Sequence, residues 1–100
     1  MGEFFQFIES VGIESLTESL KVTLWERYHN HQFIGSAKHV FKTQPLSKTA
    51  VKVHHFKVQN QVEMFLDSFI WEKYPEELIP ATVWVTQNPP FVMMTLPSEE

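Results

Sequence analysis

The sequence predicts an α+β domain with a mainly antiparallel five-stranded sheet, one long amphipathic helix over residues 61–74 on one face, and a short N-terminal helix. Three observations lead to this fold class. Apolar residues recur at helical spacing between positions 62 and 70. Five other segments are rich in β-branched and aromatic residues or alternate between apolar and polar. Polar turns and prolines separate most of these segments, which makes a two-layer arrangement the natural packing.

The composition indicates a single globular domain spanning residues 1–100. The chain is 43% apolar and includes nine Phe, which is ample material for a core at this length. It contains no Cys. Disulfides, thiolate metal sites and cysteine nucleophiles are therefore excluded.

A short amphipathic helix is expected over residues 3–10, where Phe4, Phe5 and Ile8 share one face and Gly12 follows as a stop. The first residues include an acidic side chain where a signal peptide would be basic, and no apolar run is long enough to span a bilayer. We therefore expect a soluble, cytoplasmic protein with no membrane contact.

Residues 15–28 fit two patterns. Leu16, Leu20, Leu24 and Tyr28 recur at helical spacing, whereas the stretch from 21 to 28 also alternates and contains Val, Thr and Trp. Because a polar segment at 29–32 could join two strands, we predict a helical turn at 14–19 and a hairpin of strands 20–28 and 33–41.

The boundaries of the predicted elements are clearer in the second half of the chain. We expect a loop at 44–47 around Pro45 and a strand at 49–58. Asn60 suits a helix N-cap, with Glu63 three residues later, and Pro75 ends the helix predicted at 61–74. The residues predicted to pack this helix on the sheet are Val62, Phe65, Leu66, Phe69 and Ile70. Strands are predicted at 79–86 and 91–96.

Charge is strongly segregated along the chain. The net charge is −4, yet residues 27–62 contain six basic residues and no acid, and they also contain all five His. The six basic residues are Arg27, Lys38, Lys42, Lys48, Lys52 and Lys57. The acidic residues lie on both sides of this segment, so basic and acidic regions can attract each other within or between molecules.

Strand alternation predicts a face that carries both aromatic and basic side chains. On the expected hairpin, Trp25 shares a face with Lys38 and Lys42, and Trp84 of the fourth strand lies on the more polar face of its own strand. Such a face resembles a stacking platform for bases or other planar groups. The alternative is that the N-terminal helix or a second subunit covers both Trp residues.

The last predicted strand is apolar on both of its faces. Its candidate partner-binding residues are Phe91, Met93, Met94 and Leu96. A strand of this kind is either sandwiched between two layers or contacts a partner, and Met is common at adaptable binding surfaces. Covering by the N-terminal helix is the other interpretation.

We find no pattern that indicates catalysis or a cofactor. His54 and His55 are adjacent on a strand and point to opposite faces, and His29 with His31 lacks a third ligand. Three Gly in the whole chain leave no phosphate-binding loop. We therefore expect no metal, no cofactor and no enzymatic activity.

The sequence-based hypothesis is a small non-enzymatic interaction or regulatory module that associates with itself or with a protein partner. The alternative hypothesis is nucleic-acid or polyanion binding through the basic 27–62 segment, with Arg27, Lys38, Lys42, Lys52 and Lys57 contacting phosphates and the Trp residues stacking on bases.

Overall fold

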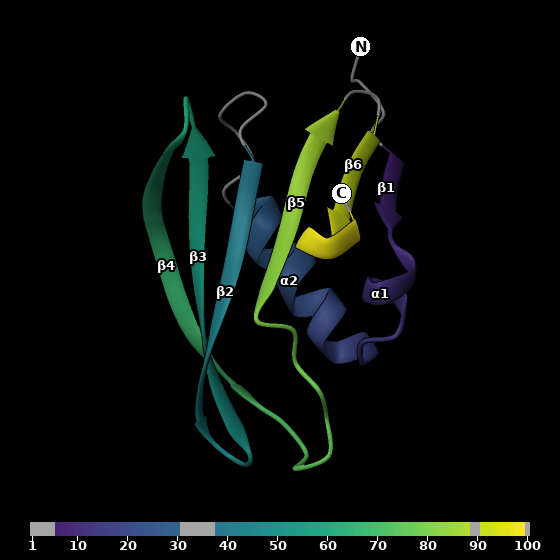
Figure 1. The fold of residues 1–100 in the computed structure, drawn as a ribbon, viewed down its shortest axis with the longest axis vertical. Helices are drawn as coiled ribbons and strands as arrows, with labels where there is room; N and C mark the ends of the chain where they lie inside the picture. Colours follow the sequence, from purple (N-terminus) through teal and green to yellow (C-terminus); the bar gives the residue numbers. More distant parts are fainter. Residues whose placement is uncertain (1–5, 31–37, 89–90, 100) are drawn as a thin grey trace.

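The structure is a computed structural model that describes residues 6–30, 38–88 and 91–99 (Figure 1). Within these ranges the chain forms a six-stranded sheet, two α-helices and a C-terminal 3-10 turn, η1. The elements are β1 (Gln6–Glu9), α1 (Val11–Glu14), α2 (Glu18–Asn30), β2 (Lys38–Ser47), β3 (Ala50–Gln59), β4 (Val62–Glu72), β5 (Thr82–Asn88), β6 (Phe91–Thr95) and η1 (Pro97–Glu99). The predicted α+β class is confirmed.

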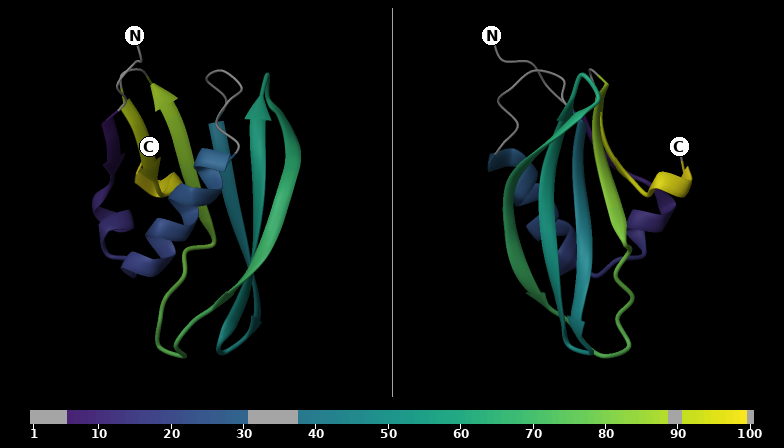
Figure 2. Two further views of the ribbon diagram at one scale, coloured as in Figure 1. Left: turned by 180° about the vertical axis from the view of Figure 1, so that it is seen from behind. Right: turned by 60° about the vertical axis from the view of Figure 1, so that its left-hand side comes forward.

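The sheet is mainly antiparallel, as predicted, but it has six described strands where five were predicted, because residues 6–9 and 62–72 form strands and residues 20–28 do not. Its strand order is β1-β6-β5-β2-β3-β4. The edge strand β1 pairs parallel with β6, and the other neighbours pair antiparallel. Helix α2 lies across one face of the sheet, as the two views in Figure 2 show, and η1 lies on the other side. In the described ranges, no helix has the length and apolarity needed to cross a membrane.

The core lies between α2 and the strands. Leu20, Leu24 and Tyr28 are buried at i, i+4 and i+8, so a single stripe of the helix faces the sheet. Ile13 of α1 joins them. The strands contribute Phe41, Val51, Val53, Val83, Val85, Val92 and Met94. Alternation along each strand places these residues on the same face.

The helix predicted at 61–74 is wrong, because residues 62–72 form β4. Asn60 and Gln61 both have positive φ, at 54° and 65°, and make a two-residue hairpin turn instead of a helix N-cap. The apolar residues fit helical spacing, but Val, Phe, Ile and Trp are also strong strand formers. Pairing with β3 along its whole length therefore outweighs the local pattern.

The strand predicted at 20–28 is also wrong, because this segment is the main helix. Val22, Thr23 and Trp25 suit a strand, yet they are tolerated in α2 because Leu20, Leu24 and Tyr28 bury a complete helical stripe. Of the hairpin predicted with 33–41, only residues from Lys38 onwards are described as strand, in β2. Residues 31–37 lie outside the described ranges.

Two smaller predictions are corrected as well. Residues 6–9 of the expected N-terminal helix form β1, which pairs with β6; residues 1–5 lie outside the description. The expected loop at 44–47 is the end of β2. Strand β5 pairs with β2 only from His39 to Lys42, and the β2–β3 register shifts after Pro45, so this proline lies where the ladder is already ending. The strands predicted at 49–58, 79–86 and 91–96 correspond to β3, β5 and β6.

Candidate functional site

The face of the sheet that points away from α2 is the candidate functional surface, and we call it the open face. His39 and Phe41 of β2 are buried towards the helix, so the intervening residues Lys38, Val40 and Lys42 point the other way. Among the described elements, only the short turn η1 lies on this side of the sheet (Figure 2). Most of the open face therefore has no second layer within the described part of the chain.

A shallow groove of about 440 Å³ crosses the open face. Cross-strand pairing places Val40 beside Trp84 of β5 and beside Phe56 of β3, which forms an apolar row across three strands. The groove is lined by Lys38, Val40, Lys42, Val58, Glu63, Thr82, Trp84 and Pro97. Its lining thus combines the apolar residues Val40, Val58, Trp84 and Pro97 with the charged residues Lys38, Lys42 and Glu63.

Two lysines of the groove lie over aromatic rings. The Nζ atom of Lys38 is 3.2 Å from the centroid of the Trp84 ring. The Nζ atom of Lys42 is 5.0 Å from the centroid of Phe56 and 3.0 Å from Oε1 of Glu63. Cation–π contact and ion pairing therefore hold both ammonium groups at the surface of the sheet in defined positions.

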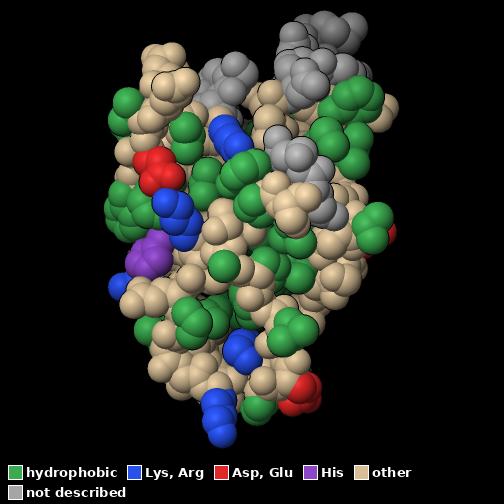
Figure 3. Space-filling view, in the orientation of Figure 1, with side chains coloured by type: hydrophobic (Ala, Val, Ile, Leu, Met, Phe, Trp, Pro, Cys, Tyr) green, Lys and Arg blue, Asp and Glu red, His purple; other side chains and the backbone are tan. Residues whose placement is uncertain are grey.

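The charge segregation of the sequence is only partly kept between the two sides of the molecule. Lys38, Lys42, Lys52 and His54 share the open face by strand register, and Figure 3 shows Lys and Arg side chains spread over this side. Glu14, Glu18 and Glu26 belong to the helices on the opposite side. The open face thus carries three lysines together with Glu63 and Glu72, and the helix side carries acids together with Lys21, Arg27 and Lys57.

The structure brings six of the sequence-predicted residues onto the open face. Their register positions show this by alternation from the buried residues Phe41, Val53, Val85 and Met94. The six residues are Trp84, Lys38, Lys42, Lys52, Phe91 and Met93.

Other predicted site residues lie elsewhere. Trp25 is on α2, where its Nε1 donates to Oε2 of Glu9 at 2.8 Å, so it does not share a face with Trp84. Met94 is buried in the core, and Leu96 packs against that core. Lys57 is buried on the helix-covered face.

Arg27 is removed from the proposed anion site by its own ion pair. Its Nη1 lies 3.3 Å from Oδ2 of Asp67, and its guanidinium lies over the Phe69 ring, 4.5 Å from the centroid. The basic segment therefore divides among the open face, the core, the helix and the β2–β3 turn. It does not form one continuous strip.

Sequence reasoning missed a buried polar network between three strands. Nδ1 of His39 and Nε2 of His55 are joined by a hydrogen bond of 2.8 Å, and Nδ1 of His55 lies 3.6 Å from Oδ1 of Asp67. The His55 ring stacks on Phe41 at 4.3 Å. The ring of Tyr28 packs edge-on against His39 at 4.8 Å, and burial raises the pKa of this tyrosine above its usual value.

The network lies away from the groove on the open face. Both His rings are buried, and neither residue lines the groove on the open face. The sequence did offer a signal that these His are buried. His39 is two residues from Phe41 and His55 is two residues from Val53, and strand residues at this spacing lie on the same face. Among the described residues, no three His, Asp or Glu side chains are grouped to hold a metal ion.

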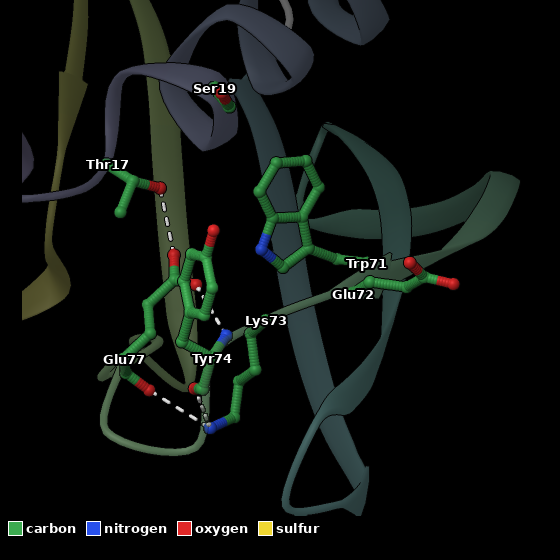
Figure 4. Close-up of a pocket in the computed structure, with 7 residues that line it drawn as sticks. All are labelled: Thr17, Ser19, Trp71, Glu72, Lys73, Tyr74 and Glu77. Atoms are coloured by element: carbon green, nitrogen blue, oxygen red, sulfur yellow. Dashed lines mark hydrogen bonds between the residues drawn. The ribbon is translucent and has the colours of Figure 1, made fainter.

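A second cavity of about 390 Å³ lies beside the start of α2, between the rings of Trp71 and Tyr74 (Figure 4). The Thr17 hydroxyl donates to Oε2 of Glu77 at 2.8 Å, and Lys73 Nζ donates to the backbone oxygen of Glu77 at 3.1 Å. The first bond joins the segment after β4 to the residue that precedes α2, and the second lies within that segment. Nε1 of Trp71 is buried and finds no hydrogen-bond acceptor among the described residues.

Comparison with known proteins identifies the fold alone. No protein-family model matches the chain, and no curated protein matches it. It is similar to the crystal structure of a protein of unknown function from Enterococcus faecalis, with a TM-score of 0.65 over 100% of this chain and 98% of that chain, at 17% sequence identity. At that identity the two chains share a fold, and function is not transferred between them.

Proposed function

We propose that this protein is a non-enzymatic interaction module that binds a protein partner through the open face of its sheet. The observation that carries this proposal is the composition of the groove: Val40, Val58 and Trp84 provide an apolar floor, and Lys38 and Lys42 stand at its rim. An antiparallel sheet with one face in water normally presents polar side chains there. A half-covered aromatic and apolar floor is instead typical of a surface that a partner completes.

The partner surface has a defined chemistry. An aromatic side chain such as Trp84 provides binding energy when it is desolvated, and the two ammonium groups select acidic groups around it. We therefore infer a partner segment that combines apolar side chains with Asp or Glu. Binding would exchange the Lys42–Glu63 ion pair for an equivalent pair with the partner.

Affinity capture from the source cell, with matched variants, tests this proposal. The open-face variant combines Lys38→Glu with Trp84→Ala, and its charge-matched control combines Lys48→Glu in the β2–β3 turn with Val22→Ala on the exposed side of α2. We expect the parent and the control to retain the same protein, and the open-face variant to lose it. Equal capture by both variants would place the binding surface elsewhere.

A second candidate function is polyanion binding, because Lys38, Lys42 and Trp84 meet at one groove. It is supported less well, since both ammonium groups already have partners and Glu63 lies in the same groove. Titration with single-stranded and duplex oligonucleotides at about 50 mM salt tests it, because phosphate contacts are strong there. Binding that quenches Trp fluorescence and weakens in Lys38→Glu would favour it; no binding would remove it.

A further inference from the structure

The two edges of the sheet differ sharply in length. Strand β1 closes one edge with four residues, whereas β4 forms the other edge with eleven (Figure 1). On its inner side β4 pairs with β3 from Val62 to Glu72. No other described strand pairs with its outer side, so a long row of backbone donors and acceptors is available there.

The side chains of β4 favour pairing. Large apolar residues are exposed along the strand, including Phe65 at 58% and Ile70 at 53%. Charged residues on an edge strand usually prevent association, but here Glu63 is turned inward to Lys42 and Asp67 to Arg27. The ion pairs within the molecule therefore remove much of the protection that these acids would give.

A β-bulge decides which residues share a face. Phe56 pairs with Phe65 and His55 pairs with Asp67, so Leu66 is the extra residue. Glu63, Phe65, Ser68, Ile70 and Glu72 are therefore on the open-face side. Val62, Met64, Asp67, Phe69 and Trp71 are on the helix side.

We propose that β4 pairs antiparallel with β4 of a second copy of this chain, about a two-fold axis at Ser68. When the bulge is kept in both copies, this register sets Phe65 opposite Ile70 and Met64 opposite Trp71, twice each. Phe65 and Ile70, which are both more than half exposed, thus lie symmetrically about Ser68, and this is the self-complementarity that a two-fold interface requires. A register centred one residue earlier would instead set the two Asp67 carboxylates against each other.

The same register has one unfavourable pair, and changing it provides a second test of the register. It sets Glu63 opposite Glu72 of the second copy at each end of the paired strands. Like charges directly opposite each other weaken a strand pair, although Lys42 partly neutralises Glu63. Replacing Glu72 with Lys should therefore strengthen self-association.

The dimer would join the six strands of each copy into one continuous sheet, with the two open faces on the same side. This inference goes beyond the proposed function and does not depend on it, because it uses strand pairing along the outer side of β4; of the groove residues, only Glu63 belongs to that strand. A failure of the β4 interface would leave the capture experiment on Lys38 and Trp84 unaffected.

Disulfide trapping tests the register directly, because the chain has no Cys. Residues directly opposite in an antiparallel pair have Cα atoms about 4.5–5.5 Å apart, which is within the range that a disulfide spans. Ser68→Cys should therefore give a covalent dimer on mild oxidation. Ile70→Cys is the matched control on the same face of the same strand; its two copies lie several residues apart and should remain uncross-linked.

Sedimentation of the reduced proteins supplies the second readout. The parent should sediment as a dimer, Glu72→Lys should dissociate less readily, and Phe65→Lys should raise the dissociation constant at least about tenfold. Because Phe65 is mostly exposed, the Phe65→Lys protein should keep the far-UV circular dichroism spectrum of the parent. A monomeric parent, a Phe65→Lys protein that remains as dimeric as the parent, or equal cross-linking of Ser68→Cys and Ile70→Cys would each overturn the proposal.

Discussion

The two faces of one sheet have different physical roles. On the helix-covered face, Phe41, Val53, Val85 and Met94 are fully buried beneath α2. On the open face, Lys38, Lys42 and Trp84 surround a groove that no described helix covers. The strands are the same and the residues alternate, so the difference comes from which side α2 packs against. One face packs against α2, and the other face carries the groove through which we propose that a partner binds.

The difference also separates two kinds of polar group. On the covered face, His39 and His55 bond to each other, and Asp67 lies beside His55 and pairs with Arg27. On the open face, Lys42 and Glu63 form an ion pair in which both side chains are 44% exposed. Removing a partner from the first set should be costly, and removing one from the second should matter little.

The largest expected effect is in the covered core. Phe41→Ala removes a fully buried ring that packs on His55 and faces the α2 stripe. It should lower the free energy of unfolding by about 3–5 kcal/mol because it loses burial and leaves a cavity. Urea denaturation measures this value, and a loss below about 1 kcal/mol would contradict the assignment of Phe41 to the core.

A smaller loss is expected in the buried network. His55→Leu removes the hydrogen bond to Nδ1 of His39 and should cost about 1–3 kcal/mol. The double variant with His39→Leu should cost less than the sum of the two single variants, because the two groups depend on each other. Strict additivity in urea denaturation would show that the two rings are not coupled.

A pH effect follows from Tyr28. Burial raises its pKa, so the folded state disfavours the phenolate, and this contribution to stability is complete below the ordinary tyrosine pKa of about 10. Stability should fall as the pH rises above that value, and Tyr28→Phe should show a shallower fall. Urea denaturation at a series of alkaline pH values measures this, with Tyr74→Phe as the control. Identical slopes for the parent and Tyr28→Phe would contradict the burial of this hydroxyl.

The smallest effect is expected for the exposed pair on the open face. A double-mutant cycle on Lys42→Ala and Glu63→Ala should give a coupling energy of about 0.2–1 kcal/mol, falling with added salt. A salt-independent coupling well above that range would mean that this part of the open face is dehydrated and not open.

The sequence predicted those parts of the fold in which local pattern and long-range pairing agree. Residues 50–59 include three Val and alternate in burial, and they pair on both sides, so β3 was predictable. Residues 62–72 satisfy both a helical and an extended pattern. The turn at Asn60 and the pairing with β3 make this segment a strand, and the spacing of apolar residues reveals neither of them. For α2 the opposite ambiguity was resolved by burial of the Leu20, Leu24 and Tyr28 stripe.

The candidate site, like the fold, was predictable only in part. Alternation was enough to predict Lys38 and Lys42 on one face, and the structure adds Trp84 to them because β5 pairs with β2. Trp25 could not be placed correctly once its segment was taken as a strand. The β4 edge was missed for the same reason, because a residue such as Phe65 that was assigned to a buried helix face is exposed on an edge strand.

Two adjacent methionines on β6 allow the most direct test of the difference between the faces. Met94 is fully buried on the covered face, whereas Met93 is only partly buried on the open face, and both can be changed to Ala without altering charge. In urea denaturation, Met94→Ala should lower the free energy of unfolding by about 2–5 kcal/mol, and Met93→Ala should lower it by less than about 1 kcal/mol. Equal losses for the two variants would contradict the account, because they would show that both faces of the sheet are packed alike.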